Sequence, residues 1–190
     1  MVRGGIGTST WDTLHVALSD ATPISIGMAT IVVALIFTVA VVILNKHWVY
    51  FFMAIPIFGV GFLIDLVNDV ILVDFEVTSL VLRILTYSLG LALLPLGGSL
   101  LIISTFPAGV FDEFNLAVMR ALKKESLIGI RVIMEITAVT VALIVSLSAG
   151  NGIGTIHIGT LIFAISVGFI LKIYLKLFER IGLYENKQND

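Results

Sequence analysis

The chain has 190 residues, of which 58% are hydrophobic and 13% are charged, and its mean hydropathy is +1.12. Soluble domains carry about 25% charged residues, so this composition indicates an integral membrane protein whose main partner is the lipid bilayer. A net charge of −2 without a basic stripe excludes nucleic-acid binding. The absence of cysteine excludes disulfides, thiolate metal sites and cysteine nucleophiles.

The sequence shows no pattern typical of an enzyme. Its three histidines (His15, His47 and His157) lie far apart and match no metal-ligand spacing. The common motifs for nucleotide binding, serine hydrolysis and zinc peptidases are missing. We therefore expect no catalytic residues, no cofactor and no metal.

Five apolar runs are long enough to cross a hydrocarbon core of ~30 Å, which takes about 20 residues in a helix. They cover residues 24–44, 49–73, 80–104, 127–148 and 158–178. The sequence therefore predicts an all-α, polytopic membrane helix bundle. Nine of the eleven lysine and arginine residues fall on the side of the Lys46 loop, residues 105–126 and the C-terminus. This asymmetry places that side, and the C-terminus with it, in the cytoplasm.

Two segments about 100 residues apart resemble each other. Residues 7–12 read GTSTWD and residues 107–112 read PAGVFD, and each aromatic–Asp pair precedes a short amphipathic stretch, an Ile-Gly and a span. The pattern predicts two short amphipathic or re-entrant helices on opposite sides of the bundle, headed by Asp12 and Asp112 as N-caps.

Together with the five spans, these short helices predict degenerate inverted repeats within one membrane domain, 1–190. Repeat one covers 1–76 and lacks its leading helix, repeat two covers 77–182, and 183–190 is a polar tail.

Glu135 is the sharpest candidate for a functional residue. It lies ~12 Å past the inner edge of the fourth span, where a carboxylate costs ~2.5–3.5 kcal/mol and usually faces a partner or a cavity. Such a group suits proton coupling. The alternative is a structural pair with Arg131, four residues earlier on the helix.

Three aspartates complete the candidate solute or ion pathway. Asp65 lies ~6 Å below the outer surface and either attracts cations there or sits at a solvated helix end. Asp12 and Asp112 serve either as plain N-caps or as paired gates where the short helices enter the membrane.

These same residues carry a family resemblance. Residues 5–14, GIGTSTWDTL, resemble the GLGTSPWDVL element of the YczE/YyaS/YitT-type bacterial membrane proteins, in particular the YczE branch. Phe111-Asp112 is similar to the second copy of that element, and Arg131 with Glu135 to the VR…E span of that branch. Thr10 departs from the family's proline. The resemblance implies a multi-pass protein of the bacterial cytoplasmic membrane and no particular activity.

Two functions fit these observations. The first is a small transporter or permease-like protein for an unknown small solute, coupled to protons through Glu135. The alternative is a non-transporting membrane scaffold or regulator of a partner enzyme. A homodimer is expected in the first case, because five thin helices do not readily enclose a pathway alone.

Overall fold

The computed structural model describes residues 1–75, 77–104, 109–123 and 127–183. Across these residues the chain forms seven α-helices and no strand, which confirms the all-α fold predicted from the sequence. The helices are α1 (Thr10–Ala21), α2 (Ile26–Asn45), α3 (Ala54–Asp65), α4 (Leu80–Ile103), α5 (Val110–Ala121), α6 (Leu127–Ser148) and α7 (Ile158–Arg180). Three shorter helical segments, η1 (Val2–Gly4), η2 (Trp48–Met53) and η3 (Leu66–Ile71), complete the fold.

Five helical segments within the described ranges are long and apolar enough to cross a membrane, as the sequence predicted. They cover Ile26–Asn45, Trp48–Ile71, Leu80–Ile103, Gly129–Ser148 and Ile158–Arg180. The second of them is composite, because η2, α3 and η3 follow one another without a break. Large apolar side chains such as Ile36 and Phe169 remain exposed on these helices, as expected for surfaces that contact lipid.

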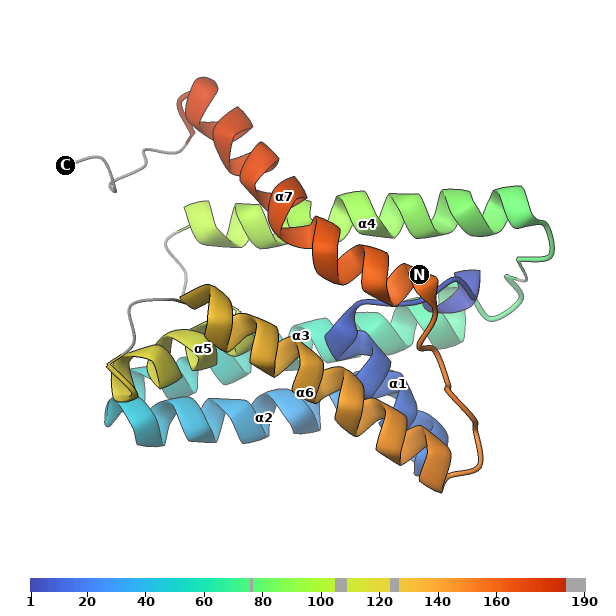
Figure 1. Cartoon of the computed structure of the whole chain (residues 1–190), viewed down its shortest axis with the longest axis horizontal. Helices are drawn as coiled ribbons and strands as arrows, with labels where there is room; N and C mark the ends of the chain where they lie inside the picture. Colours follow the sequence, from blue (N-terminus) through green and yellow to red (C-terminus); the bar gives the residue numbers. More distant parts are fainter. Residues whose placement is uncertain (76, 105–108, 124–126, 184–190) are drawn as a thin grey trace.

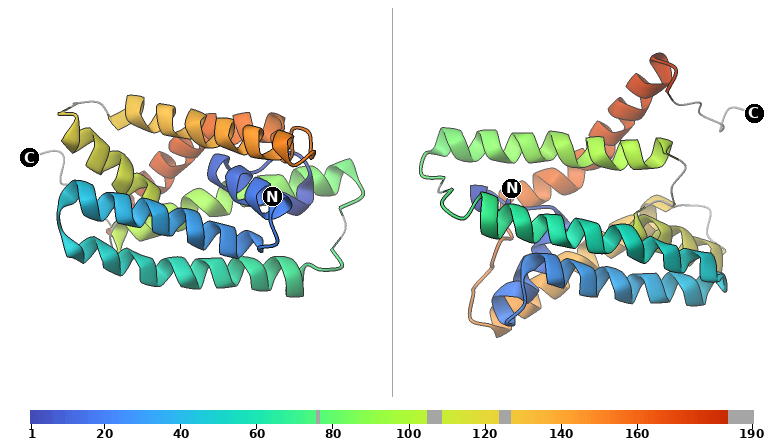
Figure 2. Two further views of the ribbon diagram at one scale, coloured as in Figure 1. Left: turned by 90° about the horizontal axis from the view of Figure 1, so that it is seen from below. Right: turned by 180° about the vertical axis from the view of Figure 1, so that it is seen from behind.

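The helices form two groups (Figure 1). In one, α2 packs against α3 and α5, and α1 packs against α6 and α2. In the other, α4 packs against α7, and the start of the chain joins the groups because η1 contacts α4 and α1 contacts α7. The right-hand view in Figure 2 shows the same separation of α4 and α7 from the α2–α3 pair.

Serine side chains start three of the helices. Ser9, Ser25 and Ser79 each accept a hydrogen bond from a backbone N–H three residues later and so cap α1, α2 and α4. The prediction that Asp12 and Asp112 are N-caps is therefore wrong. Both lie at the third position of their helices, because Ser9 and Gly109 occupy the caps.

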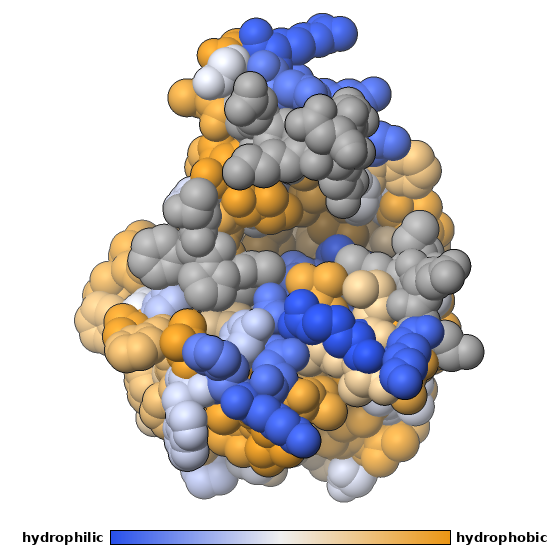
Figure 3. All heavy atoms as spheres, turned by 90° about the vertical axis from the view of Figure 1, so that its left-hand side faces the viewer, coloured by the Kyte–Doolittle hydropathy of each residue, from blue (hydrophilic) through white to orange (hydrophobic). Residues whose placement is uncertain are grey.

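Charged residues mark the ends of the bundle. Lys46 follows α2, Lys123 follows α5 and Arg180 closes α7, and these three helix ends lie at the same end of the molecule (Figure 1). Figure 3 views the molecule from this end. Hydrophilic side chains gather on the face that it shows, and hydrophobic side chains cover the sides of the molecule. Residues 107 and 108 of the second repeat motif, Glu76 at the repeat boundary, Lys124 and residues 184–190 of the polar tail lie outside the described residues.

Candidate functional site

The two short helices meet inside the bundle at their N-terminal ends. Helices α1 and α5 both have 12 residues, and in each the second residue is aromatic and the third is aspartate. The rings of Trp11 and Phe111 stack with centroids 4.0 Å apart at an interplanar angle of 13°, and Phe37 of α2 meets both rings edge-on. From this contact the helices lead toward opposite ends of the molecule (Figure 1). The two segments that resemble each other in sequence are therefore brought together.

The start of α1 is held by the start of α7. Residues 6–8 and 158–160 both read Ile-Gly-Thr, and the backbone N–H of Gly159 donates to the carbonyl of Ile6 over 3.0 Å. Tyr87 of α4 donates its hydroxyl to the Gly159 carbonyl over 2.6 Å. Gly7 has a φ of +139°, and a Cβ there would lie 2.5 Å from the backbone nitrogen of Thr160. Only glycine fits this crossing.

A chain of polar side chains joins α1, α5 and α6. The hydroxyl of Thr10 donates a hydrogen bond to Oε2 of Glu135. The other carboxylate oxygen of Glu135, Oε1, lies 3.9 Å from Nε of Arg131. The guanidinium of Arg131 also lies 3.4 Å from Asp112 Oδ1. Arg131 thus stands between two carboxylates from different helices, and about a fifth of the Glu135 side chain remains exposed. The structure brings together three of the five residues singled out from the sequence.

Asp12 belongs to a separate branch of the site. Its Oδ2 accepts a hydrogen bond of 2.6 Å from the hydroxyl of Ser9, and its Oδ1 lies 3.7 Å from Nδ1 of His15 one turn later. Burial acts to raise the pKa of Asp12. The neighbouring His15 ring, the Ser9 hydroxyl and the charge of the chain's amino group act more strongly in the other direction and leave the pKa below its usual value of 3.8. The carboxylate is therefore ionised at neutral pH.

Asp65 does not join either branch. Its carboxylate accepts 2.6 Å hydrogen bonds from the backbone N–H of Gly27 and from the hydroxyl of Ser25. It therefore compensates the positive N-terminal end of α2, where α2 and α3 pack closely through Gly27 and Gly61. The interpretation as a solvated helix end is wrong, because the carboxylate is tied to a neighbouring helix.

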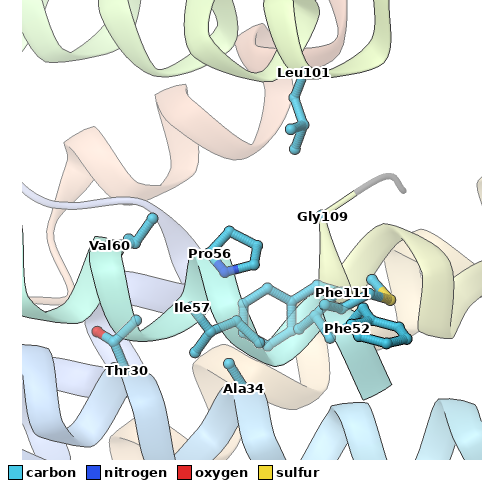
Figure 4. Close-up of a pocket in the computed structure, with 11 residues that line it drawn as sticks. Thr30, Ala34, Phe52, Pro56, Ile57, Val60, Leu101, Gly109 and Phe111 are labelled. Atoms are coloured by element: carbon cyan, nitrogen blue, oxygen red, sulfur yellow. The ribbon is translucent and has the colours of Figure 1, made fainter. Parts of the chain in front are cut away.

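Two cavities lie along α3. The larger, of about 720 Å³, lies between α3 with η3 and α4 and reaches Asp12, and Leu63, Asn68, Thr86 and Leu93 are among the residues that line it. The smaller, of about 310 Å³, is lined almost entirely by apolar side chains of α2, η2, α3 and α5. Figure 4 shows the smaller cavity, with Leu101 of α4 across from Pro56 and Val60. Val60 lines both cavities.

Sequence reasoning missed two side chains of this site. His15 is 2% exposed and neither ring nitrogen has a hydrogen-bond partner among the described residues, and Thr10 binds Glu135. The spacing of His15 three residues after Asp12, on one helix face, is a signal that could have found it. Thr10 carries no such signal, because its partner lies 125 residues away. Within the described part of the chain, no group of three or more histidine, aspartate or glutamate side chains could hold a metal ion.

Comparison with known proteins gives a family without an assigned role. The family model described as "Family of unknown function (DUF6198)" matches residues 1–176. The chain is also 26% identical over 187 residues to "Uncharacterized protein YyaS" of Bacillus subtilis (strain 168), covering 98% of this chain and 89% of that protein. No solved structure matches. The resemblance to YyaS-type proteins is confirmed, while the narrower placement in the YczE branch stays a prediction. The five apolar helices fit a multi-pass membrane protein, and the chain belongs to DUF6198, a family of unknown function.

Proposed function

We propose that this protein is a small transporter, permease-like in organisation, that moves a solute across the bacterial cytoplasmic membrane. One observation carries the proposal. The two cavities lie along the same membrane-spanning segment, Trp48–Ile71, and Val60 near its middle lines both. A solute that passed from one cavity to the other would move along α3 and cross the membrane at Val60. A scaffold has no need of such a path.

The short helices support the same proposal. Transporters are often built from inverted repeats with helices that start or break within the membrane and place their ends near the substrate site. Here α1 and α5 match in length and motif, and each packs on the span that follows the other, α1 on α6 and α5 on α2. This reciprocal packing favours an inverted repeat.

Proton coupling through Glu135 remains part of the proposal. The polar chain Thr10–Glu135–Arg131–Asp112 lies where the two short helices meet, so a change in the protonation of Glu135 would alter the contacts of both helices. The basic helix ends at one side of the bundle favour a cytoplasmic location for that side and for the C-terminus. The homodimer stays a prediction.

The decisive experiment asks whether water reaches the larger cavity. The chain has no native cysteine, so single-cysteine variants can be labelled without background. Leu63 lines the cavity, whereas its neighbour Phe62 does not and is similarly exposed, at 65% against 55%. We would make Leu63→Cys and Phe62→Cys and treat sealed vesicles of either orientation with a membrane-impermeant maleimide.

The transporter proposal expects labelling at position 63 and none at position 62, since the first faces the cavity and the second faces lipid. Val60 lines both cavities, so a tryptophan there should block the path between them. Val60→Trp in the Leu63→Cys background should therefore leave position 63 open to labelling from one side of the membrane only. If neither cysteine reacts from either side, the cavity is closed to water. That result would contradict the transporter proposal and favour the scaffold function.

A further inference from the structure

We infer that the larger cavity binds an amphipathic organic cation, a molecule with an apolar body and one positive charge that lies beside Asp12. This inference rests on the proposed function and names its substrate class.

The cavity has the size and surface of a small-molecule site. Its volume of about 720 Å³ falls within the range of about 300–1,000 Å³ that is usual for such sites. Its walls are mostly aliphatic side chains of α3, η3 and α4, and Phe75 also lines it. Walls of this kind recognise an apolar body, and they offer little to a sugar or another strongly hydrated solute.

The polar lining is sparse, and beside the chain's amino group at Met1 it holds one carboxylate. Among the residues that line the cavity, Asp12 has the only ionisable side chain, and Asn68 and Thr86 supply neutral polar groups. A third of the Asp12 side chain is exposed, although α1 is otherwise largely buried. A carboxylate that opens into an apolar cavity attracts a positive charge much more strongly than it would in water.

Two basic groups act on this carboxylate, the His15 ring and the chain's amino group, and both lower its pKa. Within the described side chains, no lysine or arginine, nor the amino terminus, lies within ion-pair distance of Asp12, and His15 is 3.7 Å away. The guanidinium of Arg131 is already placed between Asp112 and Glu135. A carboxylate that opens into an apolar cavity, with no lysine or arginine paired to it among the described side chains, leaves a place for a cation from outside.

The test uses two probe ions of nearly the same shape. Tetraphenylphosphonium and tetraphenylborate share four phenyl groups and differ in the sign of their charge. Binding of each would be measured by equilibrium dialysis on purified full-length protein in detergent, with protein-free micelles subtracted. We expect saturable binding of tetraphenylphosphonium, and at least about tenfold weaker binding of tetraphenylborate. Equal binding of the two ions, or no saturable binding of the cation, would overturn the inference.

Variants locate the probe. Asp12→Asn should weaken tetraphenylphosphonium binding at least about tenfold, because it removes the charge and keeps the shape. Asp20→Asn makes the same chemical change on the same helix, outside the residues that line the cavity, and should leave binding unchanged. Leu93→Trp fills the cavity from α4 without touching Asp12, and should abolish binding even if Asp12→Asn does not fold. Unchanged affinity in the Leu93→Trp variant would place the probe elsewhere and contradict the inference.

Different results would contradict the proposed substrate class and the proposed transport function. If the protein binds tetraphenylphosphonium but proteoliposomes do not take it up, and position 63 is not labelled, the site stands and the transporter proposal falls. If position 63 is labelled from water but the cation does not bind, the path stands and the amphipathic cation is the wrong class.

Discussion

Helices α1 and α5 have the same length and the same aromatic–Asp motif at the same positions, yet their surroundings differ. Helix α1 begins at a serine cap, buries six of its 12 residues and opens its aspartate into a large cavity. Helix α5 begins at a glycine without a side-chain cap, ends with a basic turn, and places its aspartate 3.4 Å from Arg131.

The contrast shows that two copies of one motif can share one interaction and still place their aspartates in different surroundings. The stacked rings of Trp11 and Phe111 are what the copies share, and they hold the helix ends together. The aspartates differ, because α6 supplies an arginine to Asp112 and no described residue supplies one to Asp12. One carboxylate thus pairs with an arginine of the bundle, and the other opens into the larger cavity.

The largest expected loss of stability comes from replacing a glycine before α1, and the same change before α5 should have a much smaller effect. Gly7→Ala forces a side chain into the backbone of α7 at a φ that disfavours alanine, and should destabilise the protein by at least about 2 kcal/mol. Gly109→Ala makes the same change at the cap position of α5, where a Cβ would meet only Asp112 at 3.9 Å, and should cost about 1 kcal/mol or less. Thermal unfolding in detergent, followed by circular dichroism, compares the two. Equal losses would show that the segment before α1 is not held as described.

The second largest expected loss of stability follows from removing Arg131, the cation that lies between Asp112 and Glu135. Arg131→Gln leaves two carboxylates without their counter-charge and should destabilise the protein by about 1–2 kcal/mol, a modest value because the arginine is 39% exposed. Adding Asp112→Asn to this variant should restore part of the loss, whereas adding Asp20→Asn should not. Denaturant unfolding of the four proteins gives the comparison. No rescue by Asp112→Asn would mean that the ion pair contributes nothing.

The stacked pair should show a smaller, shared effect. Trp11→Ala and Phe111→Ala each remove a half-buried ring, and the double variant should lose about 0.5–1.5 kcal/mol less than the sum of the two single losses. This double-mutant cycle measures the contact itself. Strict additivity would show that the rings are neighbours without mutual stabilisation.

The smallest expected effect concerns pH. Because the pKa of Asp12 lies below 3.8, the carboxylate stays ionised from about pH 8 down to about pH 5, and it loses its charge only as the pH falls through that low pKa. Tetraphenylphosphonium affinity should therefore change less than about twofold across this window. The other titratable groups in the site are the chain's amino group, whose pKa burial lowers from its usual value of 8.0, His15 on α1, Glu135 on α6 and Asp112 on α5. A larger change between pH 5 and pH 8 would assign the charge partner to one of these.

The candidate residues show how far sequence reasoning reaches. Arg131 and Glu135 share a helix face four residues apart, so their proximity follows from helical geometry, and the structure places them 3.9 Å apart. The likeness of residues 7–12 and 107–112 pointed to paired helices, and the structure brings Trp11 against Phe111. The caps were misread because an aspartate before an amphipathic stretch is equally compatible with the cap and with the third position, and only the backbone decides between them.

The sequence by itself determined that this is an all-α membrane protein with five spans, because length and hydropathy suffice to show which segments enter a bilayer. It also determined the two short helices, since their motifs and amphipathic spacing are local properties. The tertiary structure alone decided which aspartate pairs with an arginine and which faces a cavity. Asp12 and Asp112 occupy equivalent positions in their helices, and their difference comes from neighbours that are distant along the chain. Contacts across such distances depend on how helices pack, which no local pattern encodes.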